Sequence, residues 1–205
     1  MILYTIGKTV CRLGFTFFAR VKVIGRENIP EEGPVLLCSN HISNLDPPLV
    51  GSFMKRNIHF MAKDELFQKK GLGSLLPSLG AFPVKRGSGD RQALRMGLQL
   101  LEEGKVLCLF PEGTRSKTGE IGKGLSGSGF FALRSKASIV PVVISGPYKP
   151  FGRITIVYGP PMDFQPLREE KINAAEATEK IMESIQDLKQ KHKEQMNNER
   201  KKSGK

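Results

Sequence analysis

Short apolar runs alternate with amphipathic stretches along most of the chain. The runs predict strands at residues 18–24, 35–39, 58–62, 81–86, 106–110, 139–144 and 154–158. Helices are predicted between and after them, at 47–54, 90–103, 130–136 and 167–192. Strands that alternate with helices are typical of a sheet with parallel pairs. The sequence therefore predicts one α/β domain, a mixed, mostly parallel sheet of about seven strands flanked by helices.

The first 18 residues predict an additional amphipathic helix. Its apolar side chains recur at three- and four-residue spacing, at Ile2, Ile6, Val10, Leu13 and Phe17, while Lys8 and Arg12 occupy another face. No uncharged run approaches the roughly 20 residues that a spanning helix needs. Two interpretations stay open: a helix lying in a membrane interface, or a helix packed on the domain. We expect residues 1–18 to associate with a membrane, residues 19–188 to form a single catalytic domain, and residues 189–205 to form a frayed, basic polar tail.

Charge narrows the class of partner. Lys and Arg number 32 against 20 Asp and Glu, which gives a net charge of +12. Such a chain favours polyanions: nucleic acid, anionic lipid or phosphorylated substrates. Trp is absent and only three Tyr occur, so the chain offers few aromatic rings for base stacking, and nucleic acid is not an expected partner. Three widely spaced cysteines predict free thiols in a reducing compartment.

Candidate chemistry begins directly after the predicted strand 35–39. His41 and Asp46 lie five residues apart, in a segment whose polar residues and following prolines favour a turn. In that turn a carboxylate on Nδ1 would leave the imidazole Nε2 free to act as a general base on a hydroxyl or thiol. The alternative is that Asp46, which precedes Pro47, caps the next helix. Both roles are compatible, because a carboxylate has several acceptor sites.

Cations follow two other predicted strands. Phe110–Ser116 leaves the most apolar strand and carries Glu112, flexible backbone at Gly113, the hydroxyls of Thr114 and Ser116, and Arg115, whose guanidinium suits phosphate. Lys85 and Arg86 end the strand 81–86. Ligands bind at the carboxyl edge of open α/β sheets, so these strand ends predict a site for chemistry beside a phosphate. A solvated basic loop is the alternative.

Other familiar motifs are weak or missing. The stretch 122–127 fits G-x-G-x-x-G, but it follows a loop and lacks a ribose-binding acid about 20 residues later. The sequence contains no G-x-S-x-G and no Walker A motif, and no cluster with metal-ligand spacing. We therefore predict no metal and no resident cofactor.

Four stretches resemble, in order, the conserved blocks of the glycerophospholipid acyltransferase family. They are His41-x4-Asp46, residues 80–86, residues 110–116 and residues 139–142. The likeness spans roughly residues 20–160 and is most similar to small bacterial members that acylate lysophosphatidate. The first and third blocks together form a specific signal, whereas the second and fourth are weak alone.

The resemblance implies a reaction and a set of roles. A fatty acyl group would pass from acyl-CoA or acyl carrier protein to the sn-2 hydroxyl of lysophosphatidate, giving phosphatidate for phospholipid synthesis. His41 would be the base and Asp46 its orienting partner. Arg115, Thr114, Gly113 and Arg86, with Lys85 less firmly, would hold the acceptor phosphate. The roles of Glu112 and Ser116 stay open, and Pro141 would serve the acyl donor or shape the site.

The implied partners are lysophosphatidate, an acyl thioester and an anionic membrane surface. The implied location is the cytoplasmic side of the cell membrane, bound peripherally or at the interface. Two alternatives remain: acylation of glycerol-3-phosphate or another lysolipid, and a non-catalytic protein that binds anionic lipid.

Overall fold

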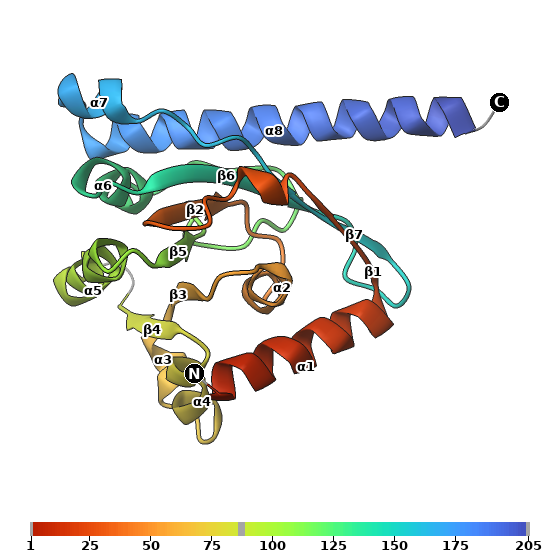
Figure 1. Cartoon of the computed structure of the whole chain (residues 1–205), viewed down its shortest axis with the longest axis horizontal. Coiled ribbons are helices and arrows are strands. Elements are labelled where there is room, and N and C mark those ends of the chain that lie inside the picture. The colour runs from red at the N-terminus through yellow and green to blue at the C-terminus, as the bar shows by residue number, and fades with distance from the viewer. Residues whose placement is uncertain (1, 86–88, 204–205) are drawn as a thin grey trace.

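The computed structural model describes residues 2–85 and 89–203, which form one twisted sheet between two helical layers (Figure 1). The strands are β1 (Arg20–Ile24), β2 (Val35–Ser39), β3 (Ile58–Lys63), β4 (Ala81–Val84), β5 (Val106–Leu109), β6 (Ser138–Ser145) and β7 (Arg153–Tyr158). The helices are α1 (Ile2–Phe18), α2 (Asp46–Phe53), α3 (Asp64–Phe67), α4 (Leu72–Ser78), α5 (Arg91–Glu102), α6 (Gly127–Arg134), α7 (Gln165–Glu169) and α8 (Ala174–Ser203), with a short 3₁₀ turn, η1 (Arg26–Asn28). The predicted α/β class is confirmed.

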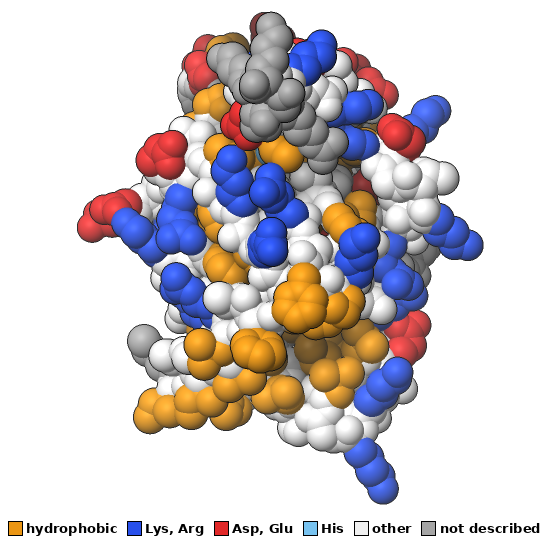
Figure 2. All heavy atoms as spheres, turned by 90° about the vertical axis from the view of Figure 1, so that its right-hand side faces the viewer, with side chains coloured by type: hydrophobic (Ala, Val, Ile, Leu, Met, Phe, Trp, Pro, Cys, Tyr) orange, Lys and Arg blue, Asp and Glu red, His pale blue; other side chains and the backbone are white. Residues whose placement is uncertain are grey.

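The seven strands lie in the order β1-β7-β6-β2-β5-β3-β4. All neighbours are parallel except β6 and β7, which are antiparallel. The mixed, mostly parallel sheet predicted from the sequence is therefore confirmed. As a consequence, the carboxyl ends of β2 to β6 meet the amino ends of β1 and β7 along one edge. We call this the carboxyl edge; Figure 2 views the molecule from that side.

The core has two halves because strand side chains alternate between the faces of the sheet. Val35 and Leu37 of β2 pack with α1 and α2, whereas Leu36 and Cys38 pack with the layer formed by α5, α6 and α8. β2 and β5 are buried on both faces, which explains their continuous apolar sequences.

Several boundaries differ from the sequence-based expectation. β4 ends at Val84, and the predicted contact residue Arg86 lies outside the described residues. The single helix expected at 167–192 is two helices, α7 and α8. The break follows from Asn173, whose side chain accepts bonds from the Ala175 and Glu176 N–H groups and caps α8. The expected frayed tail is also wrong up to Ser203, because α8 continues through the basic residues.

Helix α1 packs on the domain through one side only. Tyr4 accepts a 2.8 Å bond from the Ile58 N–H, Lys8 donates to the Lys55 carbonyl, and Phe15 is buried in the core. On the opposite side, five apolar residues form a stripe in which each is 52–88% exposed to solvent: Ile2, Ile6, Val10, Leu13 and Phe17. Helix α1 is therefore docked on the domain, and its most regular apolar stripe has no partner within the described residues. Among those residues, no helix combines the length and apolarity needed to cross a membrane.

Candidate active site

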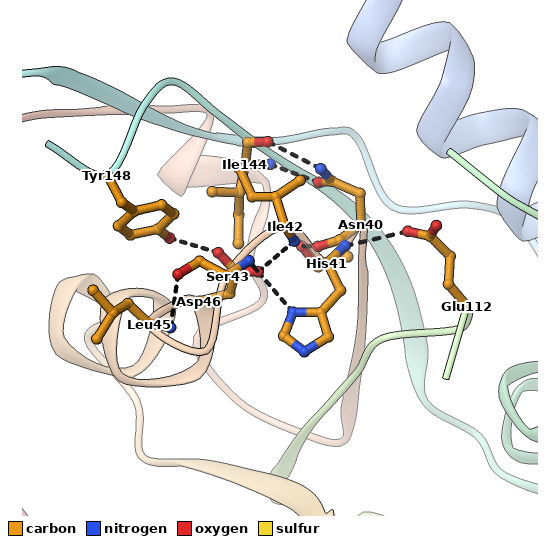
Figure 3. A network of polar contacts seen from close by, with 10 residues as sticks. Asn40, His41, Ile42, Ser43, Leu45, Asp46, Glu112, Ile144 and Tyr148 are labelled. Atoms are coloured by element: carbon orange, nitrogen blue, oxygen red, sulfur yellow. Dashed lines mark hydrogen bonds and ion pairs between the residues drawn. The ribbon is translucent and has the colours of Figure 1, made fainter. Parts of the chain in front are cut away.

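His41 stands just past the carboxyl end of β2, as predicted. The preceding residue, Asn40, fixes this position: its buried side-chain amide donates to the Ile144 carbonyl (3.0 Å) and accepts from the Ile144 N–H (2.8 Å). This two-point contact extends the pairing of β2 with β6 by one residue (Figure 3). The chain is therefore held rigidly at the point where it leaves the sheet and turns toward α2.

The turn brings His41 and Asp46 together. Nδ1 of His41 lies 2.7 Å from Oδ2 of Asp46, whose side chain is fully buried, while the His41 side chain keeps 13% of its exposure. The same oxygen accepts bonds from the backbone N–H groups of Ile42 (2.7 Å) and Ser43 (2.8 Å). These two donors keep Oδ2 on the loop side, so the neutral imidazole carries its proton on Nδ1 and leaves Nε2 as the basic nitrogen. No bond to Nε2 occurs among the described residues.

Asp46 is not a helix cap. The capping position of α2 is Leu45, and no side chain caps the helix. Asp46 is the first residue of α2, and its carboxylate points back toward the loop rather than along the helix (Figure 3). The cap interpretation is therefore wrong, and the interpretation as a partner of His41 agrees with the geometry.

Tyr148 completes the surroundings of Asp46 and was not predicted. It lies in the loop between β6 and β7, and its hydroxyl donates a 2.6 Å hydrogen bond to Oδ1 of Asp46. Burial and the nearby Asp46 charge raise the pKa of Tyr148 well above its usual range, so the hydroxyl stays protonated and remains a donor. The two carboxylate oxygens therefore have different partners: Oδ2 accepts from the imidazole, and Oδ1 accepts from the Tyr148 hydroxyl.

The loop after β5 braces His41 from the other side. Glu112 accepts the His41 N–H through Oε1 (3.2 Å) and the Gly122 N–H through Oε2 (3.0 Å). The Ser116 N–H donates to the His41 carbonyl (2.8 Å), and the Phe110 ring stacks on the imidazole at 4.1 Å between centroids. Glu112 therefore ties the β2 and β5 loops together, and in this structure Ser116 contacts His41 through its backbone.

The predicted cations do not lie equally close to His41. Arg115 and Thr114 are exposed in the loop that braces His41, and Gly113 allows that loop to turn with a φ of +65°. Lys85 follows β4, which β5 and β3 separate from β2. At roughly 4.8 Å per strand, the two backbones are about 14 Å apart. Pro141 is buried within β6 opposite Cys38, away from the loop that carries the base.

Among the residues that the structure describes, no serine or cysteine side chain bonds to the His41 imidazole. Cys38, three residues before His41, is fully buried, and burial raises the pKa of its thiol, which keeps it protonated. The Ser43 hydroxyl accepts the Leu45 N–H. A base of this kind can activate a hydroxyl of a bound molecule for direct attack on an acyl group.

Comparison with known proteins agrees with this geometry. A sequence model described as "Acyltransferase" matches residues 20–145, which include His41, Asp46, the β5 loop and Pro141. The chain belongs to the acyltransferase family. It is 33% identical over 181 residues to the 1-acyl-sn-glycerol-3-phosphate acyltransferase of Bacillus subtilis, which covers 83% of this chain and 89% of that protein.

Further relatives share the central part of this acyltransferase. The chloroplastic 1-acyl-sn-glycerol-3-phosphate acyltransferase LPAT1 of Arabidopsis thaliana is 32% identical over 63% of this chain and 37% of its own length. The crystal structure of the 1-acyl-sn-glycerophosphate acyltransferase PlsC of Thermotoga maritima superposes with a TM-score of 0.69 at 25% identity, covering 91% of this chain and 80% of that one. Tyr148 lies beyond the segment that the family model matches.

Proposed function

We propose that the protein transfers a fatty acyl group from an acyl thioester, acyl-CoA or acyl carrier protein, to the sn-2 hydroxyl of 1-acyl-sn-glycerol-3-phosphate, giving phosphatidate. The observation that carries this proposal is the His41–Asp46 pair at the carboxyl edge, in which Nδ1 bonds to the carboxylate and the His41 side chain keeps 13% of its exposure. The relatives' activities support the choice of acceptor. The thioester is a substrate, and no resident cofactor is required.

In the proposed step, Nε2 of His41 takes the proton of the acceptor hydroxyl as its oxygen attacks the thioester carbonyl. The tetrahedral intermediate then expels the thiolate, which receives the same proton from the imidazolium. Asp46 stabilises that imidazolium through Nδ1, at 2.7 Å. Because the base returns its proton within one cycle, the reaction leaves ester and free thiol and needs no covalent acyl-enzyme.

A thiol-release assay tests the reaction. The purified protein with acyl-CoA should release free CoA only when lysophosphatidate is added, and the lipid product should be phosphatidate. Release with glycerol-3-phosphate in its place would favour the alternative acceptor. No release with any acceptor, together with binding to anionic vesicles, would favour a lipid-binding protein without activity.

Arg115 is the strongest candidate for the acceptor phosphate. It directly precedes Ser116, whose N–H bonds to the His41 carbonyl, and it is exposed toward solvent. In glycerol phosphate lipids the phosphate and the sn-2 hydroxyl are a few bonds apart, so both must be bound within the reach of one loop. Lys85 follows β4, whose backbone lies about 14 Å from that of β2 by strand spacing, and it would serve as a more distant contact.

Replacing Arg115 by Ala should raise the acceptor KM about 10- to 150-fold, since a charge-assisted hydrogen bond contributes about 1.5–3 kcal/mol. Arg115→Lys should restore part of the loss, because an ammonium lacks the planar fork. Lys117→Ala is the matched control, an exposed cation two residues away, and should change KM by less than about threefold. Steady-state kinetics would contradict the assignment if Arg115→Ala raised only the acyl-CoA KM.

We also propose that the exposed stripe of α1 lies in an anionic membrane surface. Its five large apolar side chains face away from the domain. On the view of the carboxyl edge, hydrophobic side chains gather below a group of Lys and Arg side chains (Figure 2). A basic zone beside an apolar zone fits an interface of anionic head groups and acyl chains. The lysolipid would then reach His41 from the same side.

The triple variant Ile6→Ser, Val10→Ser and Leu13→Ser should lower binding to anionic vesicles at least about tenfold, because each buried aliphatic side chain contributes about 1.5–3 kcal/mol. Thr9→Ser, an exposed polar position on the same helix, is the control and should bind like the wild type. Co-sedimentation measures binding, and raised salt should weaken it. Binding that ignored both the triple variant and salt would contradict this orientation.

A further inference from the structure

The loop between β6 and β7, residues 146–152, reaches both the catalytic pair and the exposed apolar zone. Its Tyr148 side chain points inward and donates to Asp46. Three residues later, Phe151 points outward and is 74% exposed. We propose that this loop is a second lipid contact of the enzyme and that Tyr148 on it is a positioning residue for the His41–Asp46 pair. The proposal rests on the proposed acyltransferase function.

The lipid contact is argued first from Phe151 itself. Its φ of +58° is unfavourable for a bulky residue, and glycine would adopt it without strain. An aromatic ring held in that conformation and exposed to water contributes nothing to the core. Burial in lipid would use the ring, since transfer of a large apolar side chain out of water is favourable.

The backbone fixes where that ring lies. The Phe151 N–H donates to the Phe18 carbonyl (2.7 Å), and the Gly152 carbonyl accepts from the Arg20 N–H (2.8 Å). The loop tip is thus tied to the end of α1, next to Phe17 and Phe18, the last residues of its exposed apolar face. Phe151 therefore continues the α1 stripe onto a second element of the fold.

The charges around the tip favour an anionic surface as its occupant. Arg20, Lys149 and Arg153 are exposed, and Arg20 and Arg153 are paired neighbours at the start of β1 and β7. Residues 146–153 contain no Asp or Glu. An acidic protein surface would also meet the cations, but it would not require the adjoining apolar stripe, so a bilayer with anionic head groups fits both features.

The same loop is built to hold Tyr148 still. The Lys149 N–H bonds to the Pro147 carbonyl and the Gly152 N–H to the Lys149 carbonyl, so the loop closes on itself. The Tyr148 ring packs against the core half that contains α1 and α2. Its hydroxyl is the only donor to Oδ1 of Asp46 among the described contacts. Without this hydroxyl, the buried carboxylate would lose one of the hydrogen bonds that orient it and stabilise its ionised form.

Tyr148→Phe tests the positioning role, because it keeps the ring and removes only the hydroxyl. We expect kcat to fall about tenfold or more, with KM for both substrates within about twofold of wild type. The acid limb of the pH–rate profile should shift, since the carboxylate that faces His41 loses a hydrogen bond. In a double-mutant cycle, Tyr148→Phe should cost less in the Asp46→Asn background, where the hydroxyl no longer faces a charge.

A purely structural role for Tyr148 would lower the melting temperature and leave kcat, the pH profile and the cycle unchanged, and that result would overturn the assignment. NMR of the His41 imidazole gives a readout that needs no turnover. Its Nδ1–H signal should shift in Tyr148→Phe, and identical signals in both proteins would also overturn it. If the wild type lacked turnover, this measurement would still decide the positioning role separately from the proposed reaction.

Phe151→Gly tests the lipid contact. Glycine suits the positive φ, so the variant should melt no lower than wild type, while partition to phosphatidylglycerol-containing vesicles should fall about tenfold. Met96→Ala, which shortens an exposed apolar side chain on α5, is the control and should bind normally. Wild-type partition by Phe151→Gly would overturn the lipid contact, whatever the activity assay shows.

Discussion

His41→Ala should reduce acyl transfer by about 10²- to 10⁴-fold, the usual contribution of a positioned general base. The loss should appear in kcat, measured by thiol release at saturating acceptor and donor. The fold should survive, because the bonds of this residue to Glu112 and Ser116 come from its backbone. Asp46 would also keep its bonds from Ile42, Ser43 and Tyr148.

His59→Ala is the matched control for that experiment. His59 is half-buried in β3, and burial lowers the pKa of its imidazole, as expected for a structural histidine. Its replacement should cost stability but leave kcat within about twofold. If purified His41→Ala turned over at close to the wild-type rate, the general-base assignment would fail.

The central place of the strand at 106–110 and the place of the base could be predicted because both depend on local patterns. A continuous apolar run such as 106–110 indicates a strand that is buried on both faces, in the interior of the sheet. In the structure, β5 lies between β2 and β3. A polar turn that follows a buried strand must lie at the edge of the sheet where that strand ends. This reasoning placed His41 at the carboxyl edge. The pairing with Asp46 followed from the same turn, because only a chain that folds back can bring residues five apart into contact.

Other features depend on contacts that no local pattern contains. Tyr148 and Asp46 are 102 positions apart in the sequence, and Tyr148 meets Asp46 only because β6 lies beside β2. The cap interpretation of Asp46 failed because two loop N–H groups compete for its carboxylate. By contrast, a local pattern does mark the break between α7 and α8, although the sequence-based expectation was a single helix. Asn173 and Glu176 form a capping box, in which the Glu176 side chain accepts the Asn173 N–H.

The bonding of Asp46 leads to the second large effect. In Asp46→Asn, the amide oxygen can replace Oδ2, because the Ile42 and Ser43 N–H groups require an acceptor there. The amide nitrogen then faces Tyr148, whose hydroxyl can rotate and accept. The network keeps its shape and His41 keeps its tautomer, while the negative charge beside the imidazole is lost.

The expected result is therefore a large loss of activity with little loss of stability. A contacting opposite charge stabilises the charged form of a group by about 10- to 1000-fold, so kcat should fall by about 10²-fold, with the acceptor KM nearly unchanged. Thermal unfolding should shift by only a few degrees. Asp46→Ala should differ in stability, because it leaves four donors, the His41 Nδ1–H, the Ile42 and Ser43 N–H groups and the Tyr148 hydroxyl, without their acceptor, at about 1–3 kcal/mol for each that stays buried.

The comparison of these two variants separates charge from architecture. If Asp46 only held the loop in place, Asp46→Asn would keep both activity and melting temperature, while Asp46→Ala would lose both. If it stabilises the imidazolium, Asp46→Asn loses kcat at nearly wild-type melting temperature. Thermal melts and thiol-release kinetics on the same preparations distinguish the outcomes. The charge assignment requires the second pattern, because only the transition state places a positive charge on His41 at 2.7 Å from this carboxylate.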